Sequence, residues 1–310
     1  MERHFLKSIF LSCLAIILWW GCGAHRAMGM EVRPPAVAGT FYPGSADQLR
    51  RAVTALLNRA PRVIPEGEIM AAIAPHAGYV FSGRVAAYTY KALSFIDFDT
   101  IVIIGHDSYR EAVAFTCPVD YFRTPLGKVP VDREMIAKME EFNPGIRPNR
   151  ILHAREHTIE VQLPFLQVLG KNCKIVPLLF GNPTVENCRI LSNAILKCAG
   201  TKRVFVLAST DMSHYPPYQW AKKIDKATLE ALRSLDIDLL FSHLTEQEQK
   251  GFIPNLRTAM CARGGVGTAI LFAKARGAVH AQVLHYANSG DTPGGQKDRV
   301  VGYGAALMVK

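Results

Sequence analysis

The segment Arg203–His214 constrains this chain more than any other. Residues Val204–Ala208 form an unbroken apolar run, as expected of a strand that is buried on both faces of a sheet. The run is followed by small and polar residues that include Asp211 and His214. A buried strand that places an acid and an imidazole at its carboxyl end is typical of the sites of open α/β sheets.

The same pattern occurs twice earlier in the chain. The apolar run Ile69–Ala74 is followed by His76, and the run Ile101–Ile104 is followed by His106. Because the carboxyl ends of parallel strands lie at one edge of a sheet, we expect the three segments to meet in one shared crevice.

Strand and helix patterns alternate over residues 30–310 without a domain boundary. Further apolar runs predict strands at Ala112–Cys117, Lys174–Phe180, Ala278–Tyr286 and Arg299–Val309. Helical spacing of apolar residues predicts helices at Ser82–Leu93, Val131–Phe142, His157–Leu169, Thr184–Ala199, Tyr218–Leu235 and Gly264–Arg276, with short helices and loops over Ile237–Asn255. The sequence therefore predicts a single α/β domain, a three-layer sandwich around a mostly parallel sheet.

The composition is that of a globular protein, with 49% hydrophobic and 20% charged residues. The formal net charge of +10 is spread along the chain in short clusters such as Lys222-Lys223. This pattern indicates a solvated surface with a mild preference for anions. Because no nucleic-acid-binding motif accompanies the charge, nucleic acid is not a predicted partner.

Residues 1–29 have the pattern of a targeting segment. Basic residues precede the apolar run Ile9–Trp20, which is too short for a typical membrane span. Ala27 and Gly29 suit cleavage by a signal peptidase, Cys22 offers a lipoprotein alternative, and an uncleaved amino-terminal anchor is a third reading. All three predict an exported protein, periplasmic or membrane-anchored, that meets the membrane only through its amino terminus.

Cys261 is the candidate reactive cysteine among the five that follow the targeting segment. Their odd number and the lack of CxxC spacing argue against a disulfide scaffold. Cys261 precedes a predicted helix, and a helix amino terminus favours the thiolate form, which binds metals or attacks substrates. The alternative is a small buried core residue.

Four polar residues form two pairs at predicted element ends. Asp211 and His214 are three residues apart, so the carboxylate can orient the imidazole as a base or metal ligand. The alternative is an Asx-turn beside an exposed histidine.

Glu156 and His157 open a predicted helix, where they offer a proton relay or support for the site. The alternative is that they only complement the helix dipole.

Several blocks of the sequence together resemble one known family. Their order is that of the Memo family, called AmmeMemoRadiSam system protein B in prokaryotes, and the blocks are Val32–Pro43, Ala74–Gly83, Glu156–Leu166, Ser209–His214, Met260–Ala262 and Val300–Ala306. The resemblance implies a fold similar to class III extradiol dioxygenases, whose sites hold non-haem iron through two histidines and a carboxylate. It also implies a functional link to radical SAM and AMMECR-type proteins and, in the eukaryotic branch, binding of iron or copper and of phosphotyrosine-bearing receptor peptides.

The resemblance also implies a ligand set, from which this sequence departs at one position. The family's site uses residues that match His76, Asp211, His214 and Cys261, and a histidine after the next strand. Ser108 stands at that histidine's position, whereas His106 lies two residues earlier. Alternate residues of an extended segment point the same way, so His106 can replace the missing ligand if the segment stays extended.

Three functions follow from these residues. The leading hypothesis is an Fe(II) or copper site formed by His76 and Cys261 with His214 or His106, which supports dioxygenase-like oxidoreductase chemistry on a small molecule. In it Asp211 orients His214, the acid–base group.

Two alternatives belong to other classes. The first is a metal-free module that binds an anionic or peptide ligand, with Arg263 among its basic residues. The second is a Cys–His hydrolase with Cys261 as nucleophile, His214 as base and Asp211 as the orienting residue.

Overall fold

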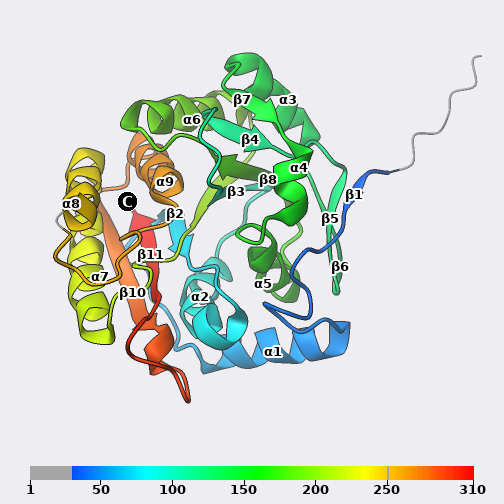
Figure 1. Ribbon diagram of the computed structural model, residues 1–310. Coiled ribbons are helices and arrows are strands. Elements are labelled where there is room, and N and C mark those ends of the chain that lie inside the picture. The colour runs from blue at the N-terminus through cyan, green and yellow to red at the C-terminus, as the bar shows by residue number, and fades with distance from the viewer. Residues whose placement is uncertain (1–29, 250) are drawn as a thin grey trace, which may run out of the picture.

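The computed structural model describes residues 30–249 and 251–310, so the predicted targeting segment lies outside the described residues (Figure 1). A twisted eight-stranded sheet forms the centre of the molecule. Its spatial order is β10 (His280–Asn288), β11 (Gly302–Val309), β2 (Ile69–Ala74), β9 (Val204–Ser209), β3 (Thr100–His106), β8 (Lys174–Phe180), β4 (Ala114–Thr116) and β7 (Ile146–Pro148).

The central strands β2, β9, β3 and β8 are parallel, as the apolar runs predict. The flanks are mixed, because β11 and β10 continue the sheet in antiparallel fashion on one side and β4 pairs antiparallel to β8 on the other. A separate three-stranded sheet consists of β1 (Val32–Arg33), β5 (Tyr121–Thr124) and β6 (Gly127–Pro130). The predicted α/β fold with a parallel centre is therefore confirmed.

Helices cover both faces of the large sheet (Figure 1). One face carries α2 (Tyr79–Leu93), with α1 (Ala46–Arg59) and α5 (Leu163–Val168) packed beside it. The other carries α6 (Val185–Cys198), α7 (Tyr218–Arg233), α8 (Ile237–Gln249) and α9 (Arg263–Ala275), while α3 (Arg133–Phe142) contacts β7 and β8, and α4 (Arg150–Arg155) follows β7.

Strand β11 shows how alternation separates the two helical layers. Tyr303 and Ala305 pack with Val85 of α2. A Cβ added at Gly302 or Gly304, which point the opposite way, would meet side chains of α7. Since successive side chains of a strand face opposite sides, α2 and α7 lie on opposite faces, and the predicted three layers are present.

Two predicted helical segments differ from the structure. The helix predicted over His157–Leu169 is wrong in its first half, where a loop leads into a 3-10 turn at Glu160–Gln162 and then α5. The Glu156 carboxylate accepts hydrogen bonds from the Ile159 N–H (2.7 Å) and the Thr158 hydroxyl (3.2 Å). Such local side-chain bonds compete with helical ones. Over Ile237–Asn255, the predicted short helices and loops contain one regular helix, α8.

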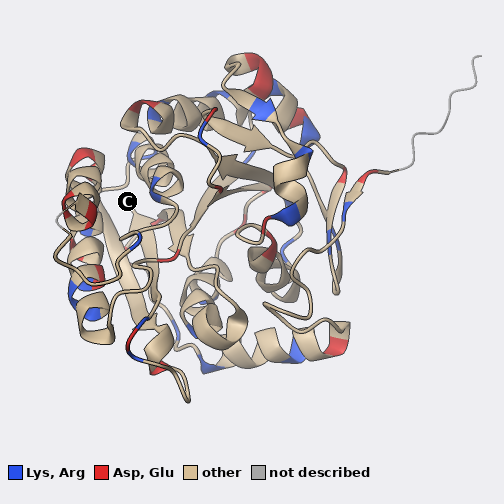
Figure 2. Ribbon diagram, in the orientation of Figure 1, with Lys and Arg blue, Asp and Glu red and all other residues tan. Residues whose placement is uncertain are grey.

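Charged side chains lie mainly on the outer helices and loops, where both signs are interspersed, and the central strands carry few (Figure 2). The net positive charge is thus distributed over several elements. Within the part of the chain that the structure describes, no helix is both long and apolar enough to cross a membrane. Export therefore stays a prediction from the sequence.

A buried ion pair anchors the amino-terminal segment to the domain. The Arg33 guanidinium donates to the carboxylate of Glu160, which is 0% exposed. That carboxylate also accepts the N–H groups of Ala36 (2.6 Å) and Val37 (3.0 Å) and the hydroxyl of Tyr42. Every oxygen of this buried charge is satisfied, as its burial requires.

Replacement of Glu160 by Ala tests this anchor. Because the change leaves the buried Arg33 with only one carboxylate, that of Glu156 at 3.4 Å, and removes the acceptor of the Ala36 and Val37 N–H groups, we expect the free energy of unfolding to fall by about 3–5 kcal/mol. Urea denaturation measures it. The matched control is Glu134→Ala, which removes the pairs of an exposed carboxylate with Lys138 and Lys202 and should cost less than about 1 kcal/mol. Equal losses in the two variants would contradict the anchoring role.

Candidate metal centre and adjoining pocket

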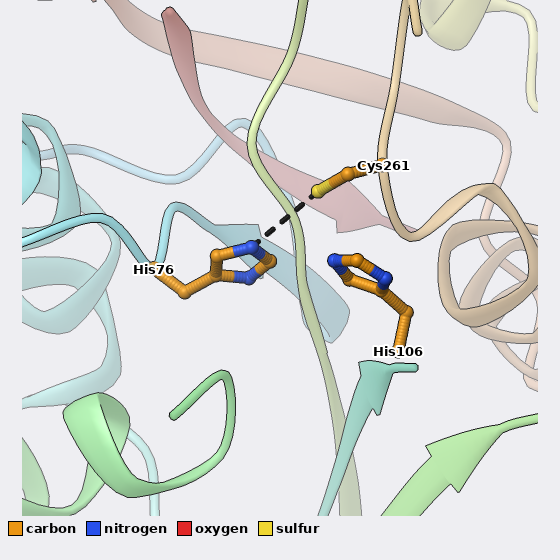
Figure 3. A group of neighbouring side chains, drawn as sticks. All are labelled: His76, His106 and Cys261. Carbon is orange, nitrogen blue, oxygen red and sulfur yellow. Dashed lines mark hydrogen bonds between the residues drawn. The ribbon is translucent and has the colours of Figure 1, made fainter. Parts of the chain in front are cut away.

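Three side chains from distant parts of the chain form a compact group. His76 follows β2, His106 is the last residue of β3, and Cys261 precedes α9. One ligand atom from each lies within 4.8 Å of the others, and Figure 3 shows the three side chains directed toward a common point. His76 Nε2 is 3.4 Å from Cys261 Sγ. The predicted crevice therefore exists at the carboxyl edge of the sheet.

His106, and not Ser108, contributes to this group. Strand β3 stays extended through His106, whose ring centroid lies 5.4 Å from that of His76. Ser108 is exposed, and its hydroxyl lies 3.5 Å from the carboxylate of Asp107. A Cβ at Gly105 would lie 1.9 Å from the hydroxyl of Thr158, so the residue before His106 must be glycine for this packing.

Asp211 lies between the group and a neighbouring pocket. Its Oδ1 accepts the backbone N–H of His76 at 2.8 Å, and its Oδ2 is 3.8 Å from His76 Nε2 and 4.0 Å from His214 Nε2. Burial raises the pKa of this carboxyl. Burial likewise lowers the pKa of His76 well below its usual value and that of His106 to about 3, so both imidazoles are neutral.

His214 is not part of the three-residue group. It lines the adjoining pocket, and its Nε2 is buried without a hydrogen-bond partner among the described residues. Burial lowers the pKa of this imidazole. His214 therefore borders the pocket, with the Asp211 carboxylate between its ring and that of His76.

The two residues predicted at the start of a helix have separate environments. His157 lines the pocket, and its ring meets that of His76 edge-on with centroids 5.5 Å apart. Glu156 does not line the pocket: it pairs with Arg33 at 3.4 Å and closes the local turn described above. Burial raises the pKa of Glu156 to about 7.

The prediction that a helix terminus lowers the pKa of Cys261 is wrong. Burial raises the pKa of this thiol, and the Asp211 carboxylate raises it further. Sγ accepts the Asp211 N–H at 3.2 Å, which favours the thiolate too weakly to offset desolvation. The other described cysteines, like Cys261, form no disulfide.

The pocket beside the group has a volume of about 740 Å³. We refer to the lining residues His157, Asp211 and His214 as the pocket floor. The rest of the lining includes Phe41, Val80, Phe81, Tyr215, Gln296, Arg299, Val301 and Tyr303. The sequence predicted the three floor residues as site residues but not the rest of the pocket lining. The blocks around Phe41, Phe81 and Val301 are those that carry the family resemblance, and this was the signal available.

A buried carboxylate holds the loop that carries His214. Asp225 of α7 accepts hydrogen bonds from the Ser213 N–H (2.9 Å), the Ser213 hydroxyl (2.9 Å) and the Tyr286 hydroxyl (2.8 Å). No cation pairs with it among the described residues, and burial raises its pKa to about 7. The native state therefore binds a proton that the unfolded state releases near pH 4.

This carboxyl group makes the stability pH-dependent. Because the pKa of Asp225 is raised in the native state, its contribution to the free energy of unfolding is complete below about pH 4. That contribution is lost as the pH rises through about 7. We expect the unfolding free energy of the wild type to decline relative to Asp225→Asn over this range, by at most about 1.4 kcal/mol per pH unit. Urea titrations at several pH values measure it. The exposed Asp238→Asn should keep the wild-type slope, and parallel slopes for wild type and Asp225→Asn would refute the assignment.

Comparison with known proteins agrees with the resemblance. The family model described as Memo-like protein matches residues 33–307. A MEMO1 family protein of Methanopyrus kandleri is 36% identical over 289 residues, which cover 89% of this chain and 98% of the relative. Those of Archaeoglobus fulgidus (34% over 281 residues; 89% and 99%) and Nitrosopumilus maritimus (31% over 284 residues; 90% and 100%) are similar along their whole length. The chain therefore belongs to the Memo family of Memo-like proteins.

Proposed function

We propose that this protein binds Fe(II) or copper through His76, His106 and Cys261 and carries out oxidoreductase chemistry on a small molecule in the adjoining pocket. The observation that supports it is the convergence of two imidazoles and a thiol from three separate elements within 4.8 Å of one another. Structural packing alone does not require three such ligands to face one point.

The donor set fits a transition metal. Imidazole and thiolate suit iron, copper or zinc, whereas magnesium and calcium prefer oxygen ligands. The two neutral imidazoles can each donate a lone pair to a metal ion. Burial raises the pKa of the Cys261 thiol, and a bound cation would displace its proton. When bound, a redox-active ion would supply electron transfer and Lewis acidity beside the pocket floor.

The pocket floor supplies acid–base groups. We assign proton transfer to His214, because this residue lines the pocket and its Nε2 has no hydrogen-bond partner among the described residues. We assign its electrostatic support to Asp211 at 4.0 Å. His157 is a second imidazole within reach of a ligand. Glu156 lies outside this arrangement, so its contribution is to close the turn Glu156–Ile159 that carries His157.

The hydrolase alternative receives less support. The imidazole contact of the Cys261 thiol is with His76 and not with the predicted base His214. Burial also raises the pKa of this thiol, which disfavours the thiolate nucleophile. The group His76, His106 and Cys261 is better explained as a set of metal ligands.

Metal analysis of the purified full chain tests the proposal. We expect iron or copper at a stoichiometric level in the wild type and a large loss in His76→Ala, His106→Ala and Cys261→Ala, because each change removes one of three ligands. The control is Ser108→Ala, which alters an exposed side chain and should keep the full metal content. Unchanged metal in His106→Ala together with loss in Ser108→Ala would reverse the assignment.

A second candidate function is the binding of an anionic ligand without metal. The predicted role of Arg263 is not supported, because its guanidinium is paired with Glu248. Arg299 instead lines the pocket and lies over the Tyr215 ring, 4.9 Å from its centroid, and Arg257 lies over the same ring at 5.4 Å. Neither guanidinium has a carboxylate partner among the described residues, so both are available to an anion.

Thermal unfolding of metal-free protein distinguishes this candidate. We expect benzoate, which combines an apolar ring with a carboxylate, to raise the Tm, and uncharged benzyl alcohol to have little effect. Arg299→Gln should abolish the shift, whereas Arg59→Gln, an exposed change in α1, should keep it. Equal shifts with both compounds, or a shift that survives Arg299→Gln, would remove the anion site.

The link to radical SAM and AMMECR-type proteins stays a prediction of the resemblance.

A further inference from the structure

A buried hydrogen-bond network lies behind His76, on the side away from Cys261. It consists of Tyr90, Gln162, Ser209 and the backbone carbonyls of Pro75 and Thr158. Tyr90, Gln162 and Ser209 are each at most 1% exposed. Since water does not reach these groups, their donors and acceptors must satisfy one another.

The network has only one consistent direction. The atom of Gln162 that lies 3.0 Å from the Pro75 carbonyl must be the amide nitrogen, because a carbonyl only accepts. That nitrogen donates its second hydrogen to Ser209 Oγ at 2.8 Å. The remaining amide oxygen accepts the Tyr90 hydroxyl at 2.9 Å. The amide orientation therefore follows from the backbone and needs no separate assumption.

The single proton of the Ser209 hydroxyl is then accounted for. Ser209 Oγ lies 2.5 Å from the Thr158 carbonyl, which can only accept, so the hydroxyl donates there. His76 Nδ1 lies 3.2 Å from the same oxygen. Because Oγ has no proton left to give, it accepts from His76, and Nδ1 must carry the hydrogen. The opposite tautomer would leave the buried Thr158 carbonyl without a donor.

We propose that Ser209 and Gln162 are positioning residues that fix His76 as the Nδ1–H tautomer and so direct the Nε2 lone pair at the Cys261 thiol. Nε2 is the atom 3.4 Å from Cys261 Sγ. Asp211 fixes the same residue from the other side through the His76 backbone N–H. The tautomer assignment does not depend on the proposed function. The effect of the tautomer on metal binding rests on that function.

Nuclear magnetic resonance of the full chain labelled with ¹⁵N-histidine tests the tautomer directly. The chain holds ten histidines, and the spectrum of His76→Gln identifies the signals of His76. We expect a protonated Nδ1 and an unprotonated Nε2 in metal-free wild type. A protonated Nε2 with a bare Nδ1 would overturn the proposal, and this measurement needs no variant of Ser209 to fold.

Ser209→Ala tests the positioning role. The matched control is Thr89→Val, which also removes a fully buried hydroxyl that donates to a backbone carbonyl, that of Ile73, but does not contact His76. Both variants should lower the Tm. Only Ser209→Ala should shift His76 toward a mixture of tautomers and weaken Co(II) binding, by about 10- to 100-fold relative to Thr89→Val.

Two outcomes separate this proposal from the metal assignment. If wild type binds no Co(II), Fe(II) or copper, the proposed function fails, while the wild-type and Ser209→Ala spectra still decide the tautomer. If Ser209→Ala keeps the wild-type tautomer and the Co(II) affinity of Thr89→Val, the positioning role is refuted, even when metal binding itself stands.

Discussion

The parallel pairing of β2, β9 and β3 is the constraint on which the site depends. Ala74 lies opposite Ser209, and Ile104 lies opposite Ala208, so the three strands end together. His76 follows β2, Asp211 follows β9 and His106 ends β3, so their side chains reach the same edge of the sheet. A slip of one residue in this register would turn His106 to the other face and separate it from His76.

Burial makes this arrangement both demanding and chemically useful. His76, Asp211 and Ser209 are almost fully removed from water, so each unpaired atom would cost about 1–3 kcal/mol. Nearly all are paired with backbone or with one another. His214 Nε2 has no hydrogen-bond partner among the described residues, and the hydrogen-bond contact of His76 Nε2 is with the Cys261 thiol at 3.4 Å. We infer that these atoms are the ones reserved for ligands.

The sequence predicted what depends on local pattern. Apolar runs located Ile69–Ala74 and Lys174–Phe180 to the residue. The ends of the runs Ile69–Ala74 and Ile101–Ile104 located His76 and His106. It could not predict what depends on three-dimensional packing. The hydrogen-bond network through Ser209 requires the register of two strands. The loop at Glu156 depends on hydrogen bonds that compete with a helix. The raised pKa of Cys261 depends on burial, which residue spacing does not reveal.

The central claim is that two imidazoles and one thiolate bind a single metal ion. X-ray absorption at the metal edge of the loaded full chain tests it most directly, since sulfur and nitrogen scatter at different distances, about 2.3 Å and 2.0–2.1 Å from a zinc-sized ion. The account predicts one sulfur neighbour with imidazole nitrogens, and loss of the sulfur in Cys261→Ser. A metal surrounded by oxygen and nitrogen alone in the wild type would contradict it.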